Sequence, residues 1–157
     1  MDINPNHQTM LTKEGLDELK AEYAELTKVK RLVAVKRLSD ARDLGDLSEN
    51  SEYAAAKQDL AFMDGRIAEL EEIIHSAKVI TNHGKSKVDL GCKVTVHVNG
   101  GKRDVYTVVG EWEADPSNKK ISHESPLGKA LLGKKVGDGV EVEAPAGKIH
   151  YKILEIE

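Results

Sequence analysis

The sequence is dominated by a heptad pattern of apolar side chains. Alternating steps of three and four residues, without an exception, separate Tyr53, Ala56, Leu60, Met63, Ile67, Leu70, Ile74 and Ala77. This spacing is typical of the seam of a coiled coil, because it keeps one stripe of a helix facing a partner helix. A stripe of this length needs a second helix to bury it, so the pattern restricts the fold before any other feature is considered.

A matching stripe precedes it in the chain. This first stripe contains Leu16, Leu19, Tyr23, Leu26, Lys30, Ala34, Leu38 and Ala41, and its steps of four around Lys30 resemble a stutter. Antiparallel pairing aligns eight layers in order, and it places Lys30 opposite Met63 with its ammonium in water. With Thr12 as the N-cap of the first helix, we expect a hairpin about 40–45 Å long whose loop, residues 44–50, projects into solvent.

The chain changes character near residue 80, beyond which ten of the 13 glycines and three of the four prolines lie. Alternating valines from Val94 to Val98 end in the turn signal Asn99-Gly100-Gly101, which predicts a hairpin with a return strand over 105–109. A short strand around Ile121, a short helix over 127–132 opened by Ser125-Pro126, and a final hairpin of 140–143 with 149–156 complete the pattern.

We therefore expect an α+β protein with two domains. The N-terminal domain, residues 1–78, is a coiled-coil hairpin with an acidic tip at 44–50. Residues 79–84 form a linker, and residues 85–157 form a small antiparallel-sheet domain with one short helix.

Composition excludes several classes of protein. No apolar run approaches the ~18–20 residues that a membrane-spanning helix needs, and secretion is not expected, because the first ten residues lack a basic stretch followed by an apolar one. The single cysteine, Cys92, excludes a disulfide framework and a zinc ribbon, so a reducing cytoplasmic setting is expected. The net charge of −4 argues against a protein that coats nucleic acid in general.

The expected loop is acidic and contains two leucines. Four carboxylates lie within ten residues: Asp43, Asp46, Glu49 and Glu52. Carboxylate oxygens suit Mg²⁺, but the two at the apex, Asp46 and Glu49, would need a second site to complete the coordination. Acids that simply solvate an exposed turn are the alternative. Leu44 and Leu47 favour contact with a partner, because exposed leucines gain nothing from water.

Basic side chains lie just behind the loop, at Lys36, Arg37, Arg42 and Lys57. A cationic patch behind an anionic tip could hold a nucleic-acid backbone while the tip carries a metal ion. A solvated helix face with surface ion pairs is the alternative explanation.

Three stretches resemble the bacterial Gre transcript-cleavage factors. Residues 41–53, which contain Gly45-Asp46-Leu47-Ser48-Glu49-Asn50, resemble the tip signature of that family. Residues 11–16 resemble the start of its first helix, and residues 121–127 resemble its Ile-Ser-x-x-Ser-Pro stretch. The resemblance covers essentially the whole chain, and it implies a coiled-coil hairpin followed by an FKBP-like domain.

The resemblance also implies a function. The chain would enter the secondary channel of RNA polymerase and stimulate Mg²⁺-dependent hydrolysis of backtracked RNA 3′ ends, which rescues arrested complexes. The resemblance gives Asp46 and Glu49 a catalytic role in which they hold a Mg²⁺ shared with the polymerase. Contact with the RNA 3′ end falls to Arg42, Lys57 and Arg37, and docking on the polymerase falls to Glu124, Ser125 and Pro126. The chain would then be a monomeric accessory factor, not an enzyme, with no cofactor of its own and no membrane partner.

Three alternatives stay open. A Gre-like protein could plug the channel without promoting cleavage, although the two tip acids argue against it. A prolyl isomerase or chaperone of FKBP type would need an aromatic pocket, for which only Tyr106, Trp112 and Tyr151 are available. A purely structural coiled coil is disfavoured by the leucines and acids at the apex.

Overall fold

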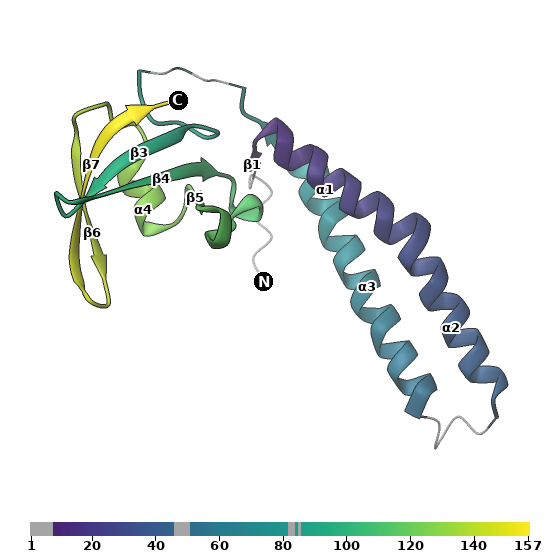
Figure 1. The fold of residues 1–157 in the computed structure, drawn as a ribbon. Coiled ribbons are helices and arrows are strands. Elements are labelled where there is room, and N and C mark those ends of the chain that lie inside the picture. Colours follow the sequence, from purple (N-terminus) through teal and green to yellow (C-terminus); the bar gives the residue numbers. More distant parts are fainter. Residues whose placement is uncertain (1–7, 46–50, 82–83, 85) are drawn as a thin grey trace. The chain divides into compact units, whose positions relative to one another are not determined.

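The computed structural model describes residues 8–45, 51–81, 84 and 86–157 (Figure 1). The chain divides into two compact units, one of Leu16–Ser76 and one of Met1–Gly15 with Ala77–Glu157. The boundary at the start of the chain differs from the predicted 1–78 domain, because Thr9–Leu11 (β1) pairs in parallel with Ala77–Val79 (β2). Within the described residues, no helix is both long enough and apolar enough to cross a bilayer.

The helical unit is the antiparallel hairpin that the heptads predict. Its first arm runs through α1 (Lys13–Glu25), the π-helical turn η1 (Leu26–Lys30) and α2 (Arg31–Asp43), and its second arm is α3 (Ser51–Ser76) (Figure 1). The predicted seam positions are buried or half-buried, with Lys30 as the exception. The most deeply buried seam side chains are Leu19, Leu26, Ala34, Ala41, Ala56 and Leu70.

The irregular spacing around Lys30 corresponds to the π-helical turn. The Thr27 hydroxyl donates to the Tyr23 carbonyl at 2.7 Å, a side-chain bond that competes with the regular backbone ladder. The wider turn changes which residue faces the partner helix. Arg31 reaches Asp64 of α3 at 2.7 Å, whereas Lys30 is exposed and pairs with Glu25 of its own arm at 3.0 Å. The predicted place of Lys30 in the seam is therefore wrong, because the π turn shifts the phase of the helix by one residue.

The other unit contains a five-stranded sheet in the order β5-β4-β3-β7-β6. Its strands are β3 (Lys93–Val98), β4 (Lys102–Val109), β5 (Lys120–Ser122), β6 (Gly139–Ala144) and β7 (Gly147–Ile156). The two predicted hairpins are present, but β5 pairs with β4 in parallel, so the sheet is not wholly antiparallel. The register between β3 and β7 shifts at Thr95, an irregularity that bends a sheet locally.

The core of this unit lies between one face of the sheet and the short helix α4 (Pro126–Leu131). Val94 and Val96 of β3, Ile153 of β7 and Leu131 of α4 are fully buried there. Cys92, just before β3, is also buried. The alternating side chains of the same strands point to the other face, which stays in contact with solvent.

The first turn of α1 belongs to this unit. Thr12 caps the helix as predicted, since its hydroxyl accepts the backbone N–H of Gly15 at 3.0 Å. The strand β1 that precedes it also lies against the 3-10 turn η2 (Glu111–Glu113). Neither the parallel β1–β2 pair nor this contact was predicted from the sequence.

Candidate functional site

The first group of candidate residues lies at the end of the hairpin where the first arm ends and the second arm begins. α2 ends at Asp43 and α3 begins at Ser51, within the limits predicted for the loop. Gly45 has a φ of 119°, a left-handed conformation that favours glycine just after a helix end. Leu44 is 78% exposed, so it clamps nothing within the described chain. Asp46 and Glu49 lie outside the described residues.

The basic residues that were predicted to form one patch lie on two different sides of the hairpin. Arg37 bonds Glu52 and Asp59 of α3, each at 2.7 Å, whereas Arg31 bonds Asp64. Glu52 and Asp59 are seven residues apart and share one side of α3. The step from Asp59 to Asp64 is five residues, which rotates about 140° around the helix and reaches the other side.

Arg42 and Lys57 both lie on the side marked by the Arg31–Asp64 pair. Lys57 precedes Asp64 by seven residues on α3, and Arg42 follows Arg31 by eleven residues on α2, so each spacing returns to nearly the same direction. Both side chains are exposed, and in the described part of the chain neither has an ion-pair partner. These two exposed cations therefore share one side of the hairpin.

Arg37 is already occupied by carboxylates. Its hydrogen bond to Glu52 holds the pKa of that carboxyl below its ordinary value, with the guanidinium charge as the second cause. The same bond raises the pKa of Arg37 further above its ordinary value. The structure therefore shows Arg37 joining the two arms of the hairpin near the tip, and it does not bring Arg37 together with Arg42 and Lys57.

Further ion pairs join the arms toward the other end of the hairpin. Arg66 of α3 donates to both carboxylate oxygens of Glu22 at 2.9 Å, and Tyr23 donates its hydroxyl to Glu71 at 2.6 Å. These partners were not predicted from the sequence. The heptad pairing could have indicated them, because residues beside paired seam positions on antiparallel helices face each other across the interface.

The second group of candidates, Glu124, Ser125 and Pro126, forms the turn before α4. Ser125 is the N-cap of that helix, where its hydroxyl accepts the N–H of Gly128 at 3.0 Å and donates to the Ser122 carbonyl at 2.6 Å. Pro126 occupies the first turn of the helix, as predicted, since its fixed φ suits that position. The turn is thus held in one conformation by short-range bonds.

Neighbouring contacts hold the same turn from its other side. The backbone N–H of Glu124 donates to the Ser122 hydroxyl at 3.0 Å, and the ring of His123 lies 3.3 Å from the Val109 carbonyl. A Cβ on Gly128 would lie 2.0 Å from the Ser122 carbonyl oxygen, so only glycine fits there. The side chains of Glu124 and Pro126 remain exposed, so this fixed turn presents them to solvent.

The aromatic residues do not assemble the pocket that a prolyl isomerase would need. Tyr151 packs in the core with its ring at 79° to that of Tyr106, and the two ring centroids are 6.5 Å apart. Trp112 is 42% exposed on η2. Of these three aromatics, only Tyr151 lines the pocket found on the described sheet. The sheet unit therefore gives no support to the isomerase alternative.

Comparison with known proteins covers almost the whole chain. Residues 9–79 match a family model described as "Transcription elongation factor, N-terminal". Residues 83–157 match a model described as "Transcription elongation factor, GreA/GreB, C-term". The two matches meet close to the predicted change of character near residue 80.

Curated relatives extend the likeness to full length. The chain is 53% identical to transcription elongation factor GreA of Thermoanaerobacter pseudethanolicus over 150 residues, which cover 94% of this chain and 96% of the relative. It is 48% identical to GreA of Lactococcus lactis with the same coverage. Among solved structures, GreA factor homolog 1 of Thermus thermophilus is 31% identical, with 96% of this chain and 99% of that chain covered and a TM-score of 0.46.

Proposed function

Because the chain belongs to the GreA/GreB family of transcription elongation factors, we propose that its hairpin enters the secondary channel of RNA polymerase and stimulates cleavage of backtracked RNA. Family membership confirms the resemblance drawn from the tip sequence, including the likeness to GreA.

The observation that carries the proposal is the position of the tip sequence on the hairpin. Two helical arms, ending at Asp43 and beginning at Ser51, are joined by the segment Gly45-Asp46-Leu47-Ser48-Glu49-Asn50 with Leu44. Arg37 ties the arms to each other close to this connection. A narrow, braced pair of helices is a suitable carrier for a short segment that must reach a confined site.

Asp46 and Glu49 are the residues proposed to act on the metal. Their carboxylates are hard oxygen ligands, which Mg²⁺ prefers, but two carboxylates leave most of an octahedral shell unfilled. Because two carboxylates cannot complete that shell, this donor set fits an ion shared with acidic residues of the polymerase. In such a site Mg²⁺ lowers the pKa of bound water and stabilises charge on phosphate oxygens.

The chain's own contribution is to position and to bind. Asp46 and Glu49 would orient the attacking water and exclude competing geometries at the polymerase centre. Arg42 and Lys57, the exposed cations on one side of the hairpin, would hold phosphates of the extruded RNA 3′ end. Arg37 has carboxylate partners of its own, so we assign it to bracing the hairpin near the tip instead of RNA contact.

The turn of Glu124, Ser125 and Pro126 is proposed to dock the sheet unit on the rim of the channel. Its backbone is fixed by the Ser125 cap and by the close approach at Gly128, so little conformational entropy would be lost on binding. On this mechanism the chain is an accessory factor that completes the polymerase site. It would work where the polymerase is, in the cytoplasm, and it would have no cofactor of its own.

The direct test is a cleavage assay on stalled, backtracked elongation complexes. Addition of the protein with Mg²⁺ should release short RNA fragments from the 3′ end, and the shortened transcripts should resume elongation. Binding to the polymerase should be followed in parallel. If the protein binds and competes for the channel but releases no fragments, it is an inhibitor of the kind left open by the sequence.

A further inference from the structure

The outer face of the sheet carries a row of basic side chains across its central strands. In the register of the sheet, Arg103 of β4 lies opposite His97 of β3, and His97 lies opposite Lys152 of β7. Lys152 in turn lies opposite Gly139 of β6. Paired residues on neighbouring strands point to the same face, and neighbouring strands are about 4.8 Å apart. The three basic residues therefore form a continuous row.

Two cationic side chains lie close together in this row. Arg103 and Lys152 are on the strands to either side of His97, about two strand spacings apart. The Arg103 Nε–H donates to His97 Nε2 at 3.4 Å, so the guanidinium and the imidazole are in contact.

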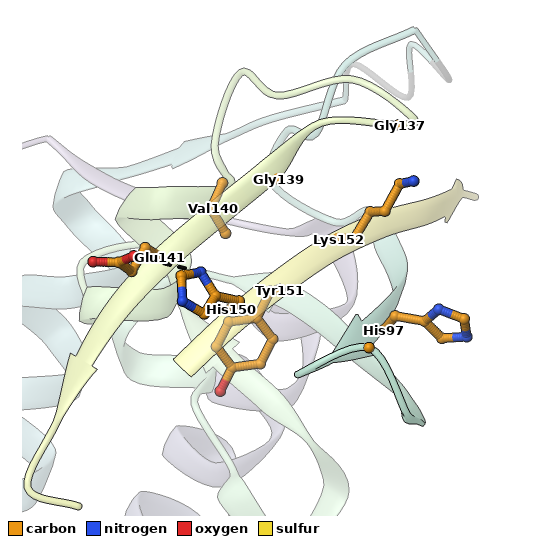
Figure 2. Close-up of a pocket in the computed structure, with 9 residues that line it drawn as sticks. His97, Gly137, Gly139, Val140, Glu141, His150, Tyr151 and Lys152 are labelled. Carbon is orange, nitrogen blue, oxygen red and sulfur yellow. Dashed lines mark ion pairs between the residues drawn. The ribbon is translucent and has the colours of Figure 1, made fainter. Parts of the chain in front are cut away.

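Two residues of the row, His97 and Lys152, line an open pocket of about 430 Å³ on the same sheet (Figure 2). His97, Lys152 and Gly139 line this pocket together with His150 and the turn at Gly100. Gly139 has no side chain, so the space beside Lys152 is open. A Cβ on Gly139 would have only the Tyr151 carbonyl oxygen nearby, at 3.9 Å. A ligand can therefore approach the backbone of β6 directly beside the ammonium group.

One carboxylate lines the pocket, and its charge is already balanced. Glu141 lies 2.6 Å from Lys148 Nζ and 3.4 Å from His150 Nδ1, the pair drawn as a dashed line in Figure 2. The Lys148 bond keeps the pKa of Glu141 below its ordinary value, so the group is a carboxylate held by the Lys148 ammonium. Among the described residues, no carboxylate forms an ion pair with Arg103, His97 or Lys152.

We propose that this pocket binds a phosphate group, held by His97 and Lys152 beside Gly139, with Arg103 next to His97 at the end of the row. A phosphate oxygen accepts hydrogen bonds from guanidinium, imidazole and ammonium groups, and its negative charge is attracted to the cations of the row. The phosphate could belong to a free nucleotide or to an RNA strand, which present the same chemistry to these side chains. The inference does not depend on the tip acids or on transcript cleavage.

The test uses the full-length, isotopically labelled chain in solution. Backbone and side-chain shifts of His97 and Lys152 are followed while inorganic phosphate, a nucleoside monophosphate or a short RNA without terminal phosphates is added. Sodium chloride at equal ionic strength is the reference. The test variant is Arg103→Gln with Lys152→Gln, and the matched control is Lys129→Gln with Lys134→Gln, which removes two exposed charges from outside the sheet.

Inorganic phosphate should shift the signals of His97 and Lys152 beyond the effect of salt. The test variant should weaken this binding by about tenfold or more, and the control should bind like the natural chain. Saturation of the same signals by RNA would identify a phosphodiester ligand, and saturation by the monophosphate alone would identify a free nucleotide. Absence of phosphate shifts, or equal shifts in the test variant and the natural chain, would overturn the proposal. The amide spectrum of each variant reports whether it is folded.

Discussion

The carboxylate of Glu113 accepts hydrogen bonds from both the backbone N–H of Thr12, at 2.9 Å, and the Thr12 hydroxyl. The same carboxylate accepts the N–H of Gly110 at 3.2 Å. A side chain from η2 thereby holds the residue that caps α1, although the two lie far apart in the sequence. It also explains Gly15, because a Cβ there would lie 2.1 Å from the Glu113 carboxyl group.

We expect Glu113→Ala to lower the free energy of unfolding by about 1–3 kcal/mol, because it leaves partly buried donors without an acceptor. Gly15→Ala should act in the same direction by displacing the carboxylate. Urea denaturation measures both effects, and hydrogen exchange at the backbone N–H of residue 15 should speed up in both variants. Glu111→Ala, which changes an exposed neighbour, is the control. Equal stability of the Glu113 and Glu111 variants would contradict this role.

The hairpin seam predicts a sharp contrast between two apolar residues of α3. Leu70 is fully buried against the first arm, whereas Phe62 is 78% exposed. Leu70→Ala should destabilise the hairpin by about 2–5 kcal/mol, the range for a buried leucine that leaves a cavity. Phe62→Ala should change stability by about 0.5 kcal/mol or less. Thermal unfolding followed by circular dichroism at the helical band compares the two, and similar losses would mean that the seam is misassigned.

The Arg37–Glu52 pair predicts a pH dependence of hairpin stability. The pKa of Glu52 is below its ordinary value of 4.5, chiefly because Arg37 donates a hydrogen bond to the carboxylate. A carboxyl group with a lowered pKa in the folded state stabilises that state above the ordinary pKa. This contribution is lost as the pH falls through the lowered value.

The difference in melting temperature between the natural chain and Glu52→Gln should therefore be constant above about pH 5.5 and shrink toward zero on acidification. The same series with Glu72→Gln, another exposed carboxylate of α3, is the control. A difference that grows on acidification would have the wrong sign for this ion pair.

For the tip acids, Asp46→Asn and Glu49→Gln keep the size of each side chain but remove its charge. If both carboxylates help to hold Mg²⁺ at the polymerase centre, transcript cleavage should fall by orders of magnitude while binding to the polymerase persists. Each ~1.4 kcal/mol of lost transition-state stabilisation lowers the rate tenfold. Higher Mg²⁺ should partly restore the weaker variant, since occupancy follows mass action.

Asp43→Asn is the appropriate control for these variants, because Asp43 is an exposed acid at the end of α2. Glu52→Gln is not, because Glu52 braces the hairpin through Arg37. Fragment release from a backtracked complex is the measurement. Near-normal release by the double variant of Asp46 and Glu49 would end the metal-sharing proposal.

The division of the basic residues predicts which of them contact RNA. Replacing Arg42 and Lys57 together by glutamine should weaken a crosslink between the tip and the RNA 3′ end more than it weakens polymerase binding. The loss should be greatest at low salt, where phosphate contacts contribute most. Lys20→Gln with Lys28→Gln removes the same amount of charge from a part of the first arm that is farther from the tip, and it should leave the crosslink intact. Arg37→Gln should reduce the stability of the hairpin and should have a smaller effect on the crosslink.

Much of the fold follows from patterns that are local in the sequence. Heptad spacing predicts the hairpin, and Ser125-Pro126 predicts the start of α4, because these signals depend on periods and caps within a few turns. The parallel pairs β1–β2 and β4–β5 could not be predicted in this way. Each involves a strand of three residues, too short to show a period of two, and its partner is chosen by tertiary packing.

The candidate site shows the same limit. The sequence identifies Arg37, Arg42 and Lys57 as basic residues near the tip, but charge alone does not tell which of them has a carboxylate partner. That distinction depends on the phase of each helix, and the π turn at Leu26–Lys30 shifts that phase within the first arm. The residues proposed to act on the metal, Asp46 and Glu49, rest on family resemblance and stay a prediction.

The short parallel pair of β1 with β2 imposes an order on folding. Its two strands come immediately before and after the whole hairpin, so pairing them in an unfolded chain would close a very long loop. Once α1 and α3 have paired, the start of α1 and the end of α3 bring the two strands within reach of each other. Most of the entropic cost of closing the loop is then removed. The hairpin should therefore act as a template that forms first, and the three-residue strands should join last.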